Sequence, residues 1–179
     1  MKEIKKGFTL IELLIVIAVL GVLAAVVLVA IDPAQQLARG RDSGRKTSIG
    51  QLGRAIQAYY TSQGKYPSLA GGEFNVVILN SGEIKTFPTN ANLPTPPVCT
   101  DGGFGFIGVS LVNNFCYKIN VNVNEAVVYT RMESKSEMTK GTCAGNYSNT
   151  WYVYATKDGR SGLVCQASEP LPTDTFIYY

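Results

Sequence analysis

The sequence of 179 residues contains no histidine. Without an imidazole the chain cannot build a Ser–His–Asp triad, a Cys–His dyad or a histidine metal site. It also has no C-x-x-C pair and no D-x-D-x-D-G loop, so zinc, thioredoxin-type and EF-hand calcium sites are not expected. We therefore expect no catalytic residue, no metal site and no cofactor, and the protein is not predicted to be an enzyme.

Charge is scarce as well. Sixteen Lys and Arg residues against thirteen Asp and Glu residues leave a net charge of +3, which by itself does not indicate a nucleic-acid partner. Glu125, Glu133 and Glu137 could supply the two carboxylates of a glycosidase. Surface acids near strand ends are the simpler interpretation, and we adopt it.

Apolar residues, in contrast, are concentrated near the N-terminus. Every residue of 13–31 is apolar apart from Gly21. At about 1.5 Å per residue, a helix of this length spans roughly 28 Å, close to the thickness of a bilayer core. The segment is either a plain uncleaved anchor or an unusual signal that is cut before the apolar run, so that the run is retained.

The orientation of this segment follows from the cysteines. Lys and Arg residues flank the run on both sides, so the positive-inside rule gives no clear answer. The four cysteines all lie in the C-terminal half, and an even number beyond a membrane segment indicates two disulfides on the oxidising side. We therefore expect a cytoplasmic N-terminus.

Glu12 is the unusual residue, because it stands just before the apolar run. A carboxylate at the centre of a membrane helix costs about 2.5–3.5 kcal/mol, and less near an end. Glu12 could be solvated at the headgroup level. Alternatively, a cut between Gly7 and Phe8 would create an α-amino group four residues before it, and the two charges could pair between staggered copies of the chain.

The short basic leader, Gly7 and the following "FTLIELLIVIAVLGVLAA" resemble the N-terminus of type IV pilins and the related pseudopilins. The resemblance covers roughly residues 1–64. It implies that a prepilin peptidase cleaves after Gly7 and methylates the new N-terminus, Phe8. It also implies that Glu12 is the glutamate of this family, which pairs subunits during assembly.

A second helix is expected over residues 33–63. Asp32 is positioned to cap it, with Pro33 in its first turn, and Gly64 is a suitable C-terminal stop. A bend of the long helix could fall at Gly21 or at Pro33. One apolar stripe of this helix should pack on a C-terminal sheet, and it comprises Ile49, Leu52, Ile56, Tyr59 and Tyr60.

The same segment is rich in glycine and in basic residues. Each helical glycine costs about 1 kcal/mol relative to alanine, so Gly40, Gly44, Gly50 and Gly53 indicate either close helix packing or a helix that bends. A basic cluster follows the apolar run and comprises Arg39, Arg41, Arg45 and Lys46. It could contact nucleic acid, form a solvated or lipid-headgroup belt, or pair with acids of a neighbouring subunit. Direct contact with nucleic acid is the least favoured of these.

The C-terminal part is predicted to be rich in β-strands, half exposed, with the last two strands joined as a hairpin by "TKDGRSG". Strands are expected at residues 76–79, 104–111, 115–121, 126–131, 151–155 and 162–166, and "NANLPTPP" at 90–97 is expected to be an extended loop. Four cysteines allow three pairings, of which we favour Cys99–Cys116 and Cys143–Cys165, because each would tie a loop to a strand. Asn146 lies in a glycosylation sequon, which is often a chance match.

These features together predict an α+β pilin fold, with a long N-terminal helix packed on a C-terminal antiparallel sheet. The expected parts are a cleaved leader (1–7), a transmembrane and filament-core helix (8–32), an amphipathic half (33–64) and a globular domain with two disulfides (65–179). The expected function is that of a structural subunit of a type IV pilus-like filament, with adhesion, motility or DNA uptake as its outcome.

The expected partners are other pilin subunits, the prepilin peptidase, the inner-membrane assembly platform and the cytoplasmic membrane. The protein would reside in the cytoplasmic membrane before assembly and in an extracellular filament afterwards. A pseudopilin of a type II secretion or competence machine is the main alternative. A membrane-anchored adhesin or binding module is an alternative of another class.

Overall fold

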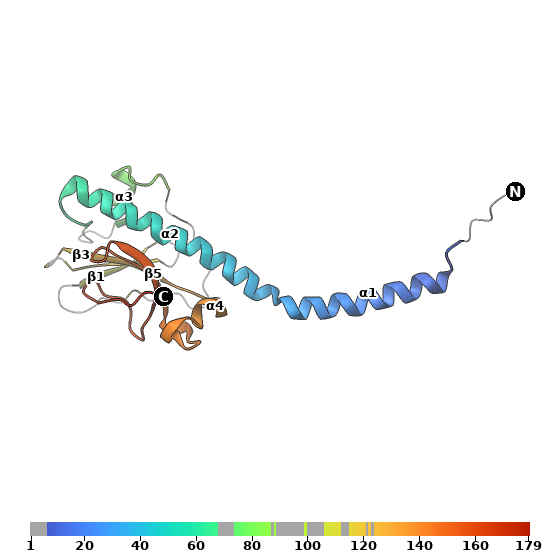
Figure 1. The fold of residues 1–179 in the computed structure, drawn as a ribbon. Coiled ribbons are helices and arrows are strands. Elements are labelled where there is room, and N and C mark those ends of the chain that lie inside the picture. Colours follow the sequence, from blue (N-terminus) through green and yellow to red (C-terminus); the bar gives the residue numbers. More distant parts are fainter. Residues whose placement is uncertain are drawn as a thin grey trace. The chain divides into compact units, whose positions relative to one another are not determined.

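The computed structural model describes residues 7–67, 74–86, 88, 99, 106–111, 115–120, 122 and 124–179. The chain divides into two units, Met1–Leu37 and Ala38–Tyr179, and each is described by itself. Figure 1 shows the order of the elements along the chain. The predicted loop at 90–97 and most of the leader lie outside the described residues.

The first unit contains α1 (Leu10–Ile31), and none of the residues of this helix is buried. By length and composition, the helical segment that begins at Leu10 is able to cross a membrane. The helix runs without interruption through Gly21 and ends at Asp32, whose φ of 46° is left-handed. The break in the helix therefore falls at Asp32–Pro33, one of the two positions that the sequence left open.

The second helix, α2 (Pro33–Gln63), begins immediately after this break. The Asp32 carboxylate accepts a hydrogen bond from the Gln35 backbone N–H at 3.3 Å, so the predicted cap is confirmed. At the other end, the Gly64 N–H donates to the Tyr60 carbonyl at 2.8 Å, and Gly64 has a φ of 71°. Gly64 thus stops the helix as predicted, because a left-handed residue ends the α-helical hydrogen-bond ladder.

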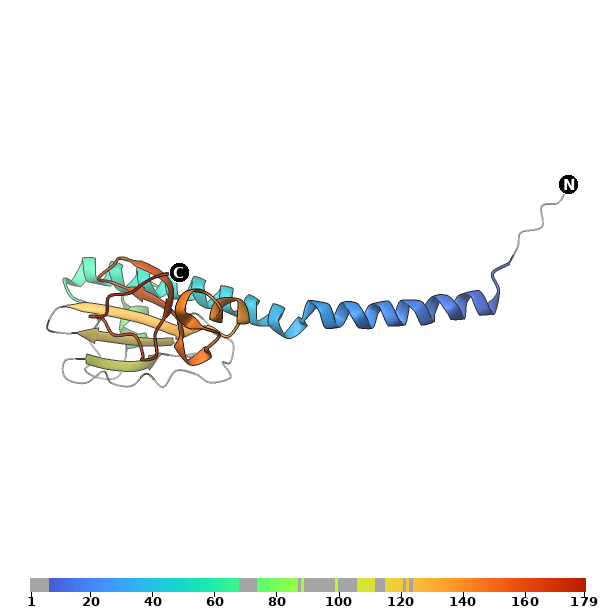
Figure 2. The same cartoon turned by 60° about the horizontal axis from the view of Figure 1, so that its bottom comes forward.

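The second unit is built around a five-stranded antiparallel sheet with the strand order β1-β2-β3-β4-β5. Each strand therefore pairs with its neighbour in sequence (Figure 2). The strands are β1 (Phe106–Leu111), β2 (Phe115–Asn120), β3 (Glu125–Arg131), β4 (Thr150–Ala155) and β5 (Arg160–Cys165). A short helix, α3 (Phe74–Asn80), precedes β1, and three helical turns lie between β3 and β4: α4 (Lys135–Met138), η1 (Gly141–Cys143) and η2 (Tyr147–Asn149).

One face of the sheet packs on α2. Ile49, Leu52 and Ile56 are fully buried in this core, and Tyr59 and Tyr60 pack against it, as the predicted stripe requires. Alternate residues of β2 and β3 point into the same core, because successive side chains of a strand face opposite sides of the sheet. The α+β architecture predicted from the sequence is confirmed.

The opposite face of the sheet is also buried, which corrects the expectation of a half-exposed sheet. A second core contains residues from the four strands β2 to β5 together with Phe176 of the C-terminal tail. All six residues of β2 are buried, among them Lys118 and Asn120. The tail (residues 166–179) is joined to the edge strand by a bridge between Val164 and Tyr178 and by the Tyr179 N–H, which donates to the Leu163 carbonyl at 3.0 Å.

One predicted strand is wrong. The segment at 76–79 belongs to the helix α3. Phe74 and Ile78 stand four residues apart and are both buried in the core under α2, a spacing that places them on one face of a helical turn. The other five predicted strands are present, and their described ends differ from the predicted ones by at most two residues. The predicted strand residues 104, 105 and 121 lie outside the described residues.

Candidate functional site

The first candidate site is the start of α1, where Thr9 and Glu12 form a capping box. The Glu12 carboxylate accepts hydrogen bonds from the Thr9 backbone N–H at 2.9 Å and from the Thr9 hydroxyl at 2.7 Å. In return, the Thr9 hydroxyl oxygen accepts from the Glu12 N–H at 3.3 Å. The spacing T-x-x-E is the sequence signature of this motif, so Thr9 could have been identified as the partner of Glu12 beforehand.

Gly7 and Phe8 precede this cap in non-helical conformation. Phe8 is 79% exposed, and no atom lies within 4 Å of the position that a Cβ on Gly7 would occupy. The peptide bond between them therefore lies on an exposed, non-helical segment immediately before a defined helix start. The three residues that the sequence singles out, Gly7, Phe8 and Glu12, thus lie together within the first turn of α1 and the residues before it.

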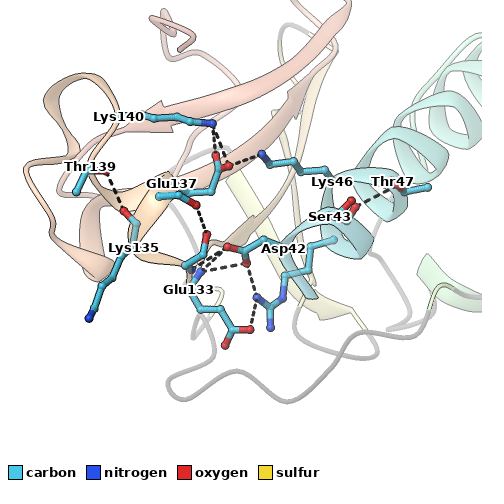
Figure 3. A network of polar contacts seen from close by, with 12 residues as sticks. Asp42, Ser43, Lys46, Thr47, Glu133, Lys135, Glu137, Thr139 and Lys140 are labelled. Carbon is cyan, nitrogen blue, oxygen red and sulfur yellow. Dashed lines mark hydrogen bonds and ion pairs between the residues drawn. The ribbon is translucent and has the colours of Figure 1, made fainter. Parts of the chain in front are cut away.

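The second candidate site is the basic cluster of α2, most of which is engaged in ion pairs with its own chain (Figure 3). The Arg41 and Arg45 guanidinium groups both contact the Glu133 carboxylate, and Arg45 Nη1 lies 2.7 Å from Asp42 Oδ1. The Glu133 hydrogen bond also raises the pKa of Arg41. Arg39 is exposed. The cluster therefore fixes α2 to its own domain through ion pairs within the chain, which the sequence did not predict.

Asp42 connects α2 to the segment after β3 in Figure 3. Its carboxylate accepts hydrogen bonds from the backbone N–H groups of Glu133, at 3.1 Å, and of Ser134, at 2.8 Å. Asp42 is only 2% exposed, and three N–H donors, the two backbone groups and Arg45, satisfy its charge. Such an arrangement supplies the hydrogen bonds without which burial of a carboxylate would be costly.

Glu137 forms the other half of this network. Its carboxylate contacts Lys46 Nζ at 2.8 Å and Lys140 Nζ at 2.9 Å. Burial alone raises the pKa of this carboxyl group, but the hydrogen bonds from the two lysines outweigh it and the pKa is lowered. Glu133 and Glu137 are each 8% exposed, so the expectation that they are surface acids is wrong.

The two disulfides join the cysteines that the sequence analysis favoured. Cys99 is bonded to Cys116 of β2, and Cys143 of η1 is bonded to Cys165 of β5. Within the described residues, no group of three or more Cys, Asp or Glu side chains could hold a metal ion.

Comparison with known proteins identifies the N-terminal segment. Residues 4–28 match the family model described as the prokaryotic N-terminal methylation motif. Together with the relatives described next, this match confirms that the N-terminal part of the chain is similar to type IV pilins.

The curated relatives are fimbrial proteins. A fimbrial protein EcpC from Eikenella corrodens is 43% identical over 70 residues, which cover 38% of this chain and 43% of the relative. The type IV major pilin protein PilE1 of Neisseria gonorrhoeae is 44% identical over 69 residues, covering 37% and 39%. The type IV major fimbrial protein FimA of Dichelobacter nodosus is 47% identical over 58 residues, covering 32% and 35%.

The chain therefore spans less than half the length of these relatives. No solved structure matches it significantly. The names of the relatives describe fimbrial and pilin proteins and not enzymes, in agreement with the expectation from the sequence.

Proposed function

We propose that this protein is a structural subunit of a type IV pilus-like filament. The observation that carries the proposal is the arrangement at the start of α1, where the exposed Gly7–Phe8 bond directly precedes a capped helix with Glu12 in its first turn. The match to the methylation motif over residues 4–28 supports it. So does the unburied apolar surface of α1, which in a single chain has no protein partner.

The proposed processing removes residues 1–7. A prepilin peptidase hydrolyses the peptide bond after Gly7, and the released α-amino group of Phe8 is methylated. The new amine carries a positive charge four residues before Glu12. Because like helices pack with a stagger in a filament, the amine of one subunit is proposed to pair with the Glu12 carboxylate of another.

The capping box gives Glu12 a partner before assembly. In the single chain its carboxylate is satisfied by the backbone N–H and the hydroxyl of Thr9. Exchange of these neutral donors for a charged amine strengthens the hydrogen bond, since charge-assisted hydrogen bonds are roughly twice as strong as neutral ones. The Glu12 carboxylate would therefore make the addition of a processed subunit energetically favourable.

The proposed localisation has two stages. The α1 helix holds the unassembled chain in the cytoplasmic membrane, where the assembly platform engages it, and the filament then carries the globular unit to the cell surface. We retain in this proposal the four parts predicted from the sequence: the leader (1–7), the membrane and filament-core helix (8–32), the amphipathic half (33–64) and the globular domain (65–179). A pseudopilin of a secretion or competence machine would share the processing but form a short, cell-bound filament, and an anchored adhesin would not assemble at all.

The test is electron microscopy of fibres sheared from the cell surface, combined with mass analysis of the N-terminus of the subunit. The proposal predicts abundant fibres whose subunit begins at methylated Phe8. A Gly7→Leu variant should keep residues 1–7, and a normal N-terminus at Phe8 in that variant would refute the cleavage step.

A Glu12→Val variant separates processing from assembly. It should insert and be cleaved like the wild type but yield at least tenfold fewer fibres. Leu13→Val is a matched control, because it changes the neighbouring apolar residue without touching a charge. Wild-type fibre yield from Glu12→Val would show that the carboxylate is merely solvated.

A further inference from the structure

Arg131 stands at the end of β3, and its guanidinium lies close to two aromatic rings. Its Cζ lies 4.6 Å from the centroid of the Trp151 ring and 5.5 Å from that of the Tyr147 ring. Trp151 is the residue paired with Arg131 across the sheet, whereas Tyr147 comes from η2. The two rings therefore hold the cation from two different elements.

No hydrogen bond or ion pair to this guanidinium is present among the residues that the structure describes. Its Nε is buried without a hydrogen-bond partner, and it is the one buried side-chain nitrogen or oxygen of the described chain in that condition. A buried donor left unpaired costs about 1–3 kcal/mol, so an acceptor that a ligand brings to this guanidinium would be stabilised.

Another aromatic-stacked arginine of the domain provides a contrast. Arg160 lies 4.0 Å from the centroid of the Tyr178 ring, and the Tyr178 hydroxyl donates to Asp158 at 2.6 Å. The ring next to Arg160 is thus hydrogen-bonded to a carboxylate of the same chain, that of Asp158. The ion-paired arginines of α2, Arg41 and Arg45, have Glu133. Arg131 has two aromatic neighbours, and no carboxylate of the described residues forms an ion pair with it.

The walls around Arg131 are fixed in place. The loop that carries Tyr147 is stapled to β5 through Cys143–Cys165, and the Thr150 hydroxyl donates to the Asn146 carbonyl at 2.7 Å. The Trp151 indole N–H donates to the Gln166 carbonyl at 2.9 Å. A ligand would therefore meet a preorganised site, which limits the entropy lost on binding.

We propose that Arg131, Tyr147 and Trp151 form a binding site for an oxyanion, either a carboxylate or a phosphate group. A guanidinium presents a planar fork of N–H donors that matches both groups, and stacking on aromatic faces holds that fork in one orientation. The site lies within the second unit, Ala38–Tyr179. It goes beyond the proposed filament function and does not depend on it.

The experiment uses Trp151, the single tryptophan of the chain, as its own reporter. The full chain in detergent micelles is titrated with sodium acetate and, separately, with inorganic phosphate, at an ionic strength held constant with sodium chloride. Because Arg131 lies close to the indole ring, anion binding should change the fluorescence emission of Trp151. This change should level off as the anion concentration rises. Saturation by acetate alone identifies a carboxylate site, saturation by phosphate alone identifies a phosphate site, and saturation by both identifies a general oxyanion site.

Arg131→Gln should abolish the saturable change, and Arg131→Lys, which keeps the charge but loses the planar fork, should weaken the apparent affinity at least tenfold. Arg160→Gln is the matched control and should behave as the wild type. A linear response, or a response unchanged in Arg131→Lys, would overturn the proposal.

A second measurement needs no variant. In ¹⁵N NMR spectra of the wild-type chain, the Nε–H signal of Arg131 should shift with the same saturation, while the signal of Arg160 stays in place. Equal shifts at both arginines would mean that the anions act only through general charge screening, and the proposal would fail.

Discussion

The carboxylate of Asp42 and the guanidinium of Arg45 form a buried ion pair one turn apart on α2, with Oδ1 2.7 Å from Nη1. The two side chains are 2% and 0% exposed. Because Asp42 also accepts the backbone N–H groups of Glu133 and Ser134, the pair fastens the helix to the chain beyond β3. A buried charge is stable only while its partner remains, so this point of α2 should be the most sensitive to substitution.

Asp42→Ala is expected to lower the free energy of unfolding by about 3 kcal/mol, since it leaves a buried guanidinium with one partner fewer and two buried N–H groups with none. Urea denaturation of the full chain in micelles, followed by Trp151 fluorescence, measures this loss. Glu83→Ala, at a half-exposed acid after α3, is the control and should change stability by less than about 0.5 kcal/mol. Equal losses in the two variants would contradict the role given to Asp42.

Glu137 should make stability depend on pH in the acid range. Its pKa is lower in the folded chain than in the unfolded one, because its hydrogen bonds to Lys46 and Lys140 outweigh the opposing effect of burial. The stabilisation is therefore complete above the unfolded value of about 4.3 and is lost as the pH falls through the lower folded value. The difference in urea midpoint between wild type and Glu137→Gln should be constant from pH 7 to about 5 and shrink below about pH 4.

The matched background for this measurement is the double variant Lys46→Gln and Lys140→Gln. There, only burial acts on the Glu137 carboxyl group, so Glu137→Gln should no longer destabilise the chain at pH 7. The urea midpoints with Glu137 and with Glu137→Gln could instead differ by the same amount at every pH and in both backgrounds. That result would show that Glu137 acts through packing alone.

The helix pattern of this chain could be predicted from sequence because its signals are local. Ile49, Leu52 and Ile56 recur at helical spacing, and the signals at Asp32 and Gly64 lie next to the ends that they define. The partners of the basic cluster could not be found in this way. Glu133 is separated from Arg41 by 92 residues, and nothing in the composition of either segment indicates the pairing.

Burial of the second sheet face was missed for a related reason. Lys118 alternates with apolar residues in β2, a pattern typical of an exposed face. In the structure its Nζ lies 2.9 Å from Glu169 of the C-terminal tail, and the Tyr129 hydroxyl donates to the same carboxylate at 3.0 Å. The tail supplies the charge that lets a lysine be buried, and a strand pattern carries no information about a segment some fifty residues away.

The disulfide between Cys143 and Cys165 should contribute about 3 kcal/mol, because it closes a loop with a sequence separation of 22 residues in the unfolded chain. Replacing both cysteines with serine should lower the urea midpoint accordingly. The same change at Cys99 and Cys116, with a separation of 17, should have a similar effect. A midpoint unchanged in the first variant would mean that the loop is held by its hydrogen bonds alone.

Gly53 and Gly40, on the same helix, should respond to alanine in opposite directions. A Cβ on Gly53 would lie 2.5 Å from Cγ of the Tyr154 ring, at the root of a side chain that packs between α2 and the sheet. Overpacking of this kind costs about 1–3 kcal/mol, which should exceed the gain of about 1 kcal/mol from helix propensity. No atom lies within 4 Å of a Cβ on Gly40, so Gly40→Ala should stabilise the chain by about 0.5–1 kcal/mol.

The urea midpoints of the Gly53→Ala and Gly40→Ala variants, measured side by side, test this difference in sign, because both substitutions add one methyl group to α2. A gain in stability from Gly53→Ala would show that the ring of Tyr154 moves away at little cost, and that close packing on the sheet is not what requires this glycine.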